Sequence, residues 1–76
     1  MYLDDYKGAI EDFTQAIRLD PRDASAYKNR GVLRANLGDR QGTLKDLREA
    51  ARLFLEQKDM DSYNALLGAI KKLQSN

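Results

Sequence analysis

Adjacent carboxylates are the residues whose type and spacing come closest to what catalysis requires. Asp4 and Asp5 form one pair, and Glu11 and Asp12 form another. Two carboxylates could act as general acid and general base, or could hold a divalent cation. Neighbouring residues on a helix point in different directions, however, and helix caps or solvated helix faces explain both pairs. We therefore predict no catalytic residue and no enzymatic activity.

Two other stretches resemble parts of ligand-binding loops but lack the residues that complete them. Asp59 and Asp61 have the spacing that opens a calcium loop, yet neither the glycine nor the terminal glutamate of that loop follows. Residues 38–42 contain two glycines, but no Lys-Ser/Thr follows, as a phosphate-binding loop requires. The chain also has no histidine and no cysteine, which are common bases, nucleophiles and metal ligands. We predict neither a metal nor a cofactor.

The balance of charge gives no reason to expect nucleic acid or a membrane as partner. The sequence contains thirteen Lys and Arg residues and twelve Asp and Glu residues, which gives a net charge of +1. No secretory signal and no apolar run long enough to span a membrane is visible, so we expect a cytoplasmic protein without a membrane partner. We expect no small-molecule substrate either. One group of basic residues is interpreted as solvated charges whose aliphatic stems pack on neighbours: Arg22, Lys28, Arg30, Arg34 and Arg40.

A sequence motif that occurs twice indicates the helices that would position these residues. GAIEDFTQAIRL at residues 8–19 returns as GTLKDLREAARL at residues 42–53, an offset of 34. Identical pairs include Asp12 and Asp46, and Leu19 and Leu53. A fixed period of this length indicates stacked helical units that cannot bury their apolar faces alone.

Apolar periodicity predicts four helices, at about residues 4–20, 24–37, 40–57 and 60–73. Aspartates at the starts are the expected N-caps: Asp4 or Asp5, Asp23, Asp39, and Asp59 or Asp61. Pro21 should end the first helix and Gly38 the second. The third helix has Leu55 where the first repeat has Pro21, so we expect it to be longer than the first by about a turn.

Each predicted helix has one apolar face. The residues expected to pack are Tyr6, Ala9, Ile10, Phe13, Ala16 and Ile17, then Ala26, Tyr27, Gly31, Leu33 and Leu37, then Leu44, Leu47, Ala50, Ala51, Phe54 and Leu55, and finally Met60, Tyr63, Leu66, Leu67, Ile70 and Leu73. Gly31 lies in mid-helix, where it costs about 1 kcal/mol relative to alanine. That cost indicates a neighbouring backbone too close to admit a side chain.

The order of these residues resembles the tetratricopeptide repeat, a helix–turn–helix unit of 34 residues. The positions that carry the resemblance are Tyr27, Gly31, Gly38-Asp39, Leu47 and Ala50 in one unit and Ala9, Phe13, Ala16 and Asp20-Pro21 in the other. The sequences of the repeats also resemble those of bacterial members of the family, especially cyanobacterial ones. The family implies an all-α, antiparallel helix–turn–helix solenoid in a single domain, residues 1–76. Residues 1–23 would be a half repeat, 24–57 a full repeat and 58–76 a capping helix.

Family members bind peptides or partner proteins in a groove lined by the first helix of each repeat, without catalysis. By the resemblance, the groove-facing residues of the 24–37 helix are Ser25, Lys28, Asn29, Val32, Ala35 and Asn36. Three departures, at Arg30, Arg34 and Thr43, make this repeat divergent. Chaperone-binding members carry an asparagine after the repeat's glycine, and Val32 stands there instead, which disfavours that specialised role.

An alternative function follows from the first helix, which matches the second helix of a repeat. Its outer flank would lack the usual neighbour, and we expect this flank to be a self-association face formed by Tyr2, Tyr6, Ala9 and Phe13. The chain would then be a structural cap of a longer solenoid, or a homo-oligomer.

Overall fold

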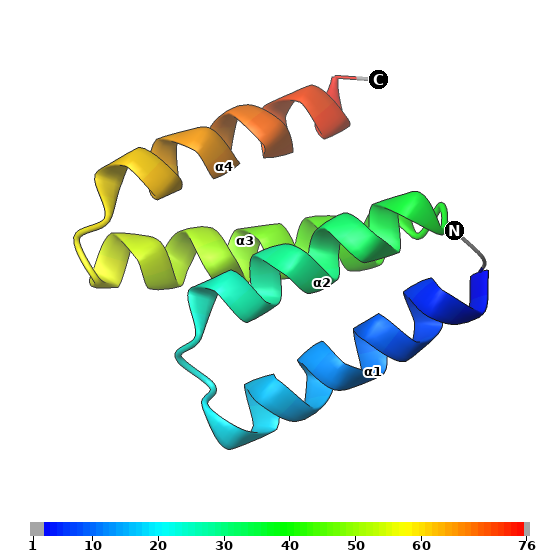
Figure 1. The fold of residues 1–76 in the computed structure, drawn as a ribbon. Helices are drawn as coiled ribbons and strands as arrows, with labels where there is room; N and C mark the ends of the chain where they lie inside the picture. The colour runs from blue at the N-terminus through cyan, green and yellow to red at the C-terminus, as the bar shows by residue number, and fades with distance from the viewer. Residues whose placement is uncertain (1–2, 76) are drawn as a thin grey trace.

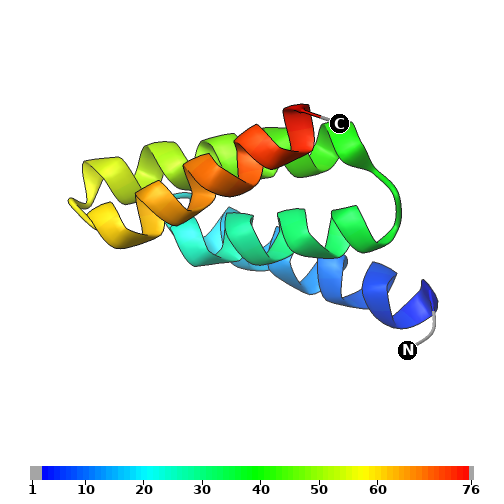
Figure 2. The same ribbon diagram turned by 90° about the horizontal axis from the view of Figure 1, so that it is seen from above.

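The computed structural model describes residues 3–75, with side chains from Asp5 onward. This part of the chain forms four α-helices and no strand: α1 (Leu3–Leu19), α2 (Ala24–Asn36), α3 (Arg40–Glu56) and α4 (Met60–Gln74). Consecutive helices run antiparallel, with α1 and α4 at opposite edges of the array (Figure 1). Seen from above, α3 and α4 lie on one side and α1 and α2 on the other (Figure 2). The predicted all-α architecture is confirmed, and each helix boundary agrees with the sequence prediction to within one residue.

Three aspartates begin helices as the sequence predicts. The side chain of Asp23 accepts a hydrogen bond from the Ala26 amide in the first turn of α2, where backbone amides lack the carbonyl partner that they have further along a helix. Asp39 and Asp59 cap α3 and α4 in the same way, at 2.9 and 3.2 Å. For α1 the prediction is wrong, because Asp4 and Asp5 lie within its first turn rather than ahead of it.

Left-handed residues end α2 and α3. Gly38 has φ +80°, and the Asp39 amide donates to the Arg34 carbonyl at 2.9 Å. Lys58 occupies the matching position after α3 with φ +63°, and the Asp59 amide donates to the Phe54 carbonyl at 2.9 Å. Both turns therefore satisfy terminal helix carbonyls in the same manner, although only one of them has the glycine that favours this backbone conformation.

The third helix is not longer than the first, contrary to the sequence prediction. Both contain 17 residues. In the register of the repeat, α3 does extend three residues beyond Leu53, the counterpart of the last residue of α1. However, α1 also begins three residues earlier than α3 in that register, and this offsets the difference.

The core gathers around α3, which packs between α2 and α4. Its buried residues are Ala24, Leu47, Ala50, Ala51, Leu53, Phe54, Leu66 and Ile70, with Tyr27, Leu44, Tyr63 and Leu73 packed against them. Leu53 was not predicted as a core residue, yet only 1% of it is exposed. Leu19, the identical residue of the first repeat, is 88% exposed. The same residue in the same register is therefore buried only where a neighbouring helix covers it.

Three predicted core residues are exposed instead. Leu55, Met60 and Leu67 have exposed fractions of 45%, 46% and 42%. Leu55 and Leu67 line a surface depression between α3 and α4. On α3 and α4, the apolar face is therefore wider than the part of it that is buried.

Gly31 marks the close approach of α2 to α3. A Cβ at this position would lie 3.1 Å from Leu47 Cδ2 and 3.2 Å from Asp46 Cβ. The predicted crowding is confirmed, but the crowding atoms belong to side chains rather than to a backbone. Thr43 adds a polar contact, since its hydroxyl donates to the Gly31 carbonyl at 3.0 Å.

Candidate functional site

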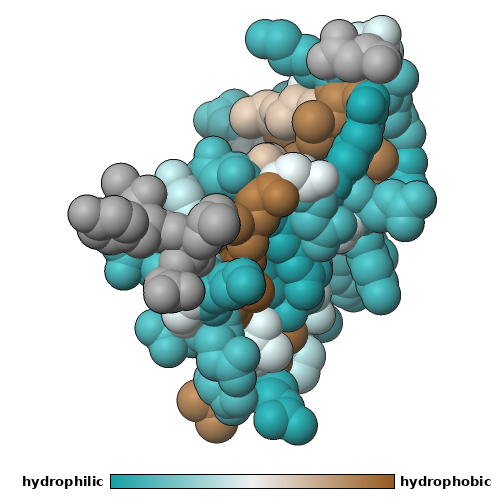
Figure 3. All heavy atoms as spheres, turned by 90° about the vertical axis from the view of Figure 1, so that its right-hand side faces the viewer, coloured by the Kyte–Doolittle hydropathy of each residue, from teal (hydrophilic) through white to brown (hydrophobic). Residues whose placement is uncertain are grey.

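A groove lies between α2 and α4, with α3 as its floor. Its volume is about 380 Å³, and its lining is mostly apolar. The lining residues are Val32, Ala35 and Asn36 of α2, Thr43 and Leu47 of α3, and Ala69, Lys72 and Leu73 of α4. Figure 3 views the end of the molecule that carries the α2–α3 turn, where apolar atoms surface in a narrow band between hydrophilic ones.

Half of the groove-facing residues predicted from the sequence line this groove. Val32, Ala35 and Asn36 do so, and Val32 is 50% exposed. The other three, Ser25, Lys28 and Asn29, lie on the first half of α2 and do not contribute to its lining.

The α4 wall of the groove was missed by the sequence analysis. Its polar member, Lys72, stands at the position that corresponds to Asn36 when the N-caps Asp23 and Asp59 are aligned. The resemblance between the starts of the two helices was therefore the signal that could have found it. The end of α4 is held against α3, because the Arg40 guanidinium donates to the Leu73 carbonyl.

Outside the lining of the groove, two arginines of α2 converge on one buried carboxylate of α3. Arg30 donates to both oxygens of Asp46, at 2.9 and 2.7 Å, and Arg34 donates to Oδ2 at 2.9 Å. The Asp46 side chain is 2% exposed, whereas the arginines are 14% and 26% exposed. Hydrogen bonding to Asp46 raises the pKa of Arg30 above its ordinary value, although partial burial opposes this. The interpretation of these arginines as solvated charges is wrong.

The same network reaches α1. Arg30 also donates to the Thr14 hydroxyl at 3.2 Å, and its guanidinium carbon lies 5.5 Å from the centre of the Tyr27 ring. Thr14 in turn donates to the Ile10 carbonyl at 2.8 Å. One arginine therefore links three helices, and its donors are committed to the fold rather than to a nucleic acid or another ligand.

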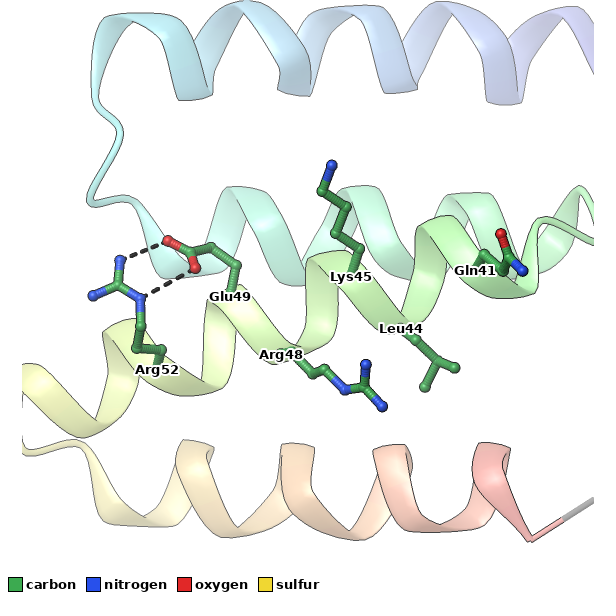
Figure 4. Close-up of a pocket in the computed structure, with 6 residues that line it drawn as sticks. All are labelled: Gln41, Leu44, Lys45, Arg48, Glu49 and Arg52. Atoms are coloured by element: carbon green, nitrogen blue, oxygen red, sulfur yellow. Dashed lines mark hydrogen bonds and ion pairs between the residues drawn. The ribbon is translucent and has the colours of Figure 1, made fainter.

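A second surface depression lies along the outer side of α3. Its six lining side chains, labelled in Figure 4, all come from this helix: Gln41, Leu44, Lys45, Arg48, Glu49 and Arg52. Arg52 donates to both carboxylate oxygens of Glu49, at 3.1 and 2.6 Å. Its hydrogen bond lowers the pKa of Glu49, while burial has a smaller opposite effect. A depression built on one helix, with its one carboxylate already paired to Arg52, offers no convergent chemistry.

The predicted self-association face is only partly visible. Tyr2 lies outside the described residues. Tyr6, Ala9 and Phe13 of α1 are half-buried. Whether copies of the chain meet there stays a prediction.

Other kinds of site find no support among residues 5–75. No group of three or more acidic, histidine or cysteine side chains is arranged to hold a metal ion in this part of the chain. In the same part, no helix combines the length and the apolar character needed to cross a membrane.

This geometry defines an all-α protein built from antiparallel helix pairs with a groove on one face. The model of the TPR repeat family matches residues 1–38, half of the chain. The chain belongs to the tetratricopeptide repeat family. Repeats of this family generally act as protein–protein interaction modules without catalytic activity.

Several curated proteins are similar to this chain. Tetratricopeptide repeat protein 36 of Homo sapiens is 49% identical over 49 residues, which is 64% of this chain and 26% of that protein. The Danio rerio protein of the same name is 43% identical over the same shares. A Nematostella vectensis homolog is 41% identical over 52 residues, or 68% of this chain and 29% of that protein. The chain thus spans about a quarter of the length of these relatives. No solved structure matches it.

These relatives are animal proteins, so the resemblance to bacterial members stays a prediction. The division into a half repeat (1–23), a full repeat (24–57) and a cap (58–76) also stays a prediction.

Proposed function

We propose that this chain is a non-catalytic protein-interaction module that binds a peptide segment of a partner protein in the α2–α4 groove. The observation that carries the proposal is the groove itself, because two helices form its walls and Thr43 and Leu47 of a third form its floor. Concave, mostly apolar sites with a few placed polar groups are typical of ligand binding.

The lining suggests the kind of peptide that would fit. Val32, which is half exposed, and Leu73, which is half-buried, offer an apolar surface for one side chain of the peptide. Lys72 can pair with a carboxylate. Asn36 can both donate to and accept from a peptide backbone. The proposed ligand is therefore a short segment with an apolar residue next to an acidic one.

A selection from a library of displayed random peptides on the immobilised chain tests this proposal. Peptides that combine an apolar and an acidic residue should be enriched, and their affinity should fall by about tenfold with Asn36→Ala and further with Val32→Asp. Asn64→Ala, which removes the same side chain from an exposed site of α4 outside the groove, is the matched control and should leave affinity unchanged. No enrichment, or peptides that bind all variants equally, would refute the groove as the site.

Other parts of the functional assignment are expectations. We expect a cytoplasmic location and a protein or peptide partner, without nucleic acid, membrane, metal or cofactor.

The alternative predicted from the sequence, a structural cap that self-associates through α1, stays a prediction. Light scattering over a range of concentrations tests it. A mass that rises with concentration supports self-association, and a constant monomer mass at high concentration removes it.

A further inference from the structure

The α2–α4 groove extends towards the turn between α2 and α3. A second, smaller depression of about 190 Å³ is lined by Ala35, Gly38, Arg40, Thr43 and Leu73. Three of these residues, Ala35, Thr43 and Leu73, also line the groove, so the two spaces adjoin. We call this extension, which adds Gly38 and Arg40 to the lining, the turn end of the groove.

The side chain of Arg40 crosses the turn end from α3 to α4. Its Nη2 donates to the carbonyl of Leu73, the residue that follows Lys72 on α4. This contact holds the guanidinium in place, whereas Nε and Nη1 donate to no acceptor within residues 5–75. Arg40 is exposed. A planar guanidinium that is already positioned loses little freedom when its remaining donors bind another acceptor.

The positive charge at the turn end is not offset by the lining. Lys72 and Arg40 are its cations, and of the side chains that the structure describes, no acidic one lines the groove or the turn end. Neither cation forms an ion pair within residues 5–75. The carboxylate of Asp39, next to Arg40 in the chain, accepts from the Gly42 amide at 2.9 Å as the cap of α3. One acidic residue of a bound peptide would pair with Lys72 and leave Arg40 unmatched.

We propose that Arg40 is a specificity-determining residue, which binds a second acidic side chain of the peptide at the turn end of the groove. The inference rests on the proposed function and deepens it. The partner segment carries two acidic residues beside its apolar one, the first paired with Lys72 and the second with Arg40. The second carboxylate accepts from the remaining donors of Arg40, and such hydrogen bonds between charged groups are stronger than neutral ones.

Arg48 provides a matched control for Arg40 on the same helix. It is exposed and forms no ion pair within residues 5–75. However, it lies on the outer side of α3 and lines neither the groove nor the turn end. Replacing either arginine with glutamine removes the same charge from α3, and only the Arg40 variant removes it from the proposed site.

A double-mutant cycle between the intact chain and a peptide tests the inference. The probe is a peptide enriched on the immobilised chain that has one apolar and two acidic residues, and its affinity is followed by fluorescence anisotropy. Arg40→Gln should weaken this peptide by about three- to fivefold, as expected for a solvent-exposed ion pair. The same variant should not weaken a peptide whose second acidic residue is replaced by its amide, because the partner of Arg40 is then absent. Arg48→Gln should leave the affinity of both peptides unchanged.

A measurement on the parent chain is independent of how well the variants fold. The NMR signal of the Arg40 Nε–H group should shift with the diacidic peptide and not with the peptide that lacks its second acid.

The outcomes separate this inference from the proposed function. If Arg40→Gln weakens both peptides equally, Arg40 acts only by holding α4, and the inference is wrong while the groove stands. The same holds if the enriched peptides carry a single acidic residue, or if the Arg40 signal does not respond to the second acid. If no peptide is enriched, or if binding is insensitive to Val32→Asp, the groove itself fails and the inference fails with it.

Discussion

Replacing Asp46 with asparagine is expected to destabilise the chain severely. The carboxylate accepts three hydrogen bonds from two guanidinium groups, at 2.7 to 2.9 Å, and its side chain is 2% exposed. Breaking a buried ion pair by removing one partner costs about 3 to 5 kcal/mol, because the other charge stays buried without its counter-ion. At about 0.05 to 0.15 kcal/mol per residue, a chain of this length has a total stability of about 4 to 11 kcal/mol. The variant therefore loses a large share of its free energy of unfolding.

Urea denaturation followed by far-UV circular dichroism measures this loss. Asp12→Asn is the matched control, since it makes the same change at the equivalent, exposed position of α1 and should alter stability by no more than about 0.5 kcal/mol. A double-mutant cycle with Arg30→Met should give a coupling of about 1 to 3 kcal/mol. If Asp46→Asn unfolds at the same urea concentration as Asp12→Asn, the ion-pair network does not hold the helices together and the reasoning fails.

Three further predictions concern stability. Lys58→Gly should stabilise the chain by about 0.5 to 1 kcal/mol, because glycine adopts the observed φ of +63° without strain; an unchanged or lower melting temperature would contradict this. Gly68→Ala should stabilise the chain by about 1 kcal/mol through helix propensity, since a Cβ there meets nothing within 4 Å. Gly31→Ala should stabilise less or destabilise, because its Cβ would lie 3.1 Å from Leu47 Cδ2 of α3. Equal melting temperatures for the two alanine variants would count against the packing of α2 on α3. The lowered pKa of Glu49 beside Arg52 contributes stability that is present above its ordinary pKa of 4.5 and is lost as pH falls through the lower folded-state value. Glu49→Gln should remove that part of the acid dependence, and identical urea midpoints for variant and parent at each pH from about 5 to 3 would refute it.

The elements could be predicted from the sequence because their signals are local. Apolar periodicity marks each helix without reference to its neighbours, capping aspartates mark the starts of α2, α3 and α4, and all four helices lie within one residue of the predicted bounds. The burial of Leu53 beside the exposure of Leu19 could not be predicted in this way, since the two residues have the same local context. Only the position of α2, which packs on different faces of the two repeated helices, distinguishes them.

The candidate site could be predicted only on the α2 side, because its other wall depends on how the helices pack. The resemblance indicated Val32, Ala35 and Asn36 of α2, but the α4 wall depends on where the last helix crosses α3. The network of Arg30, Arg34 and Asp46 was also missed, although two arginines one turn apart and an aspartate repeated at the family's period were visible. Charged residues on a helix are usually solvated, and the sequence does not say that α3 approaches closely enough to bury the carboxylate.

The most direct test of the account is an NMR titration of the intact chain with a peptide selected on it. The account predicts that the largest amide shifts fall on Val32, Asn36 and Leu73, around the α2–α4 groove, and that they vanish with Val32→Asp while the helical spectrum is retained. Shifts confined to the outer side of α3, or shifts at the groove that persist in this variant, would contradict it.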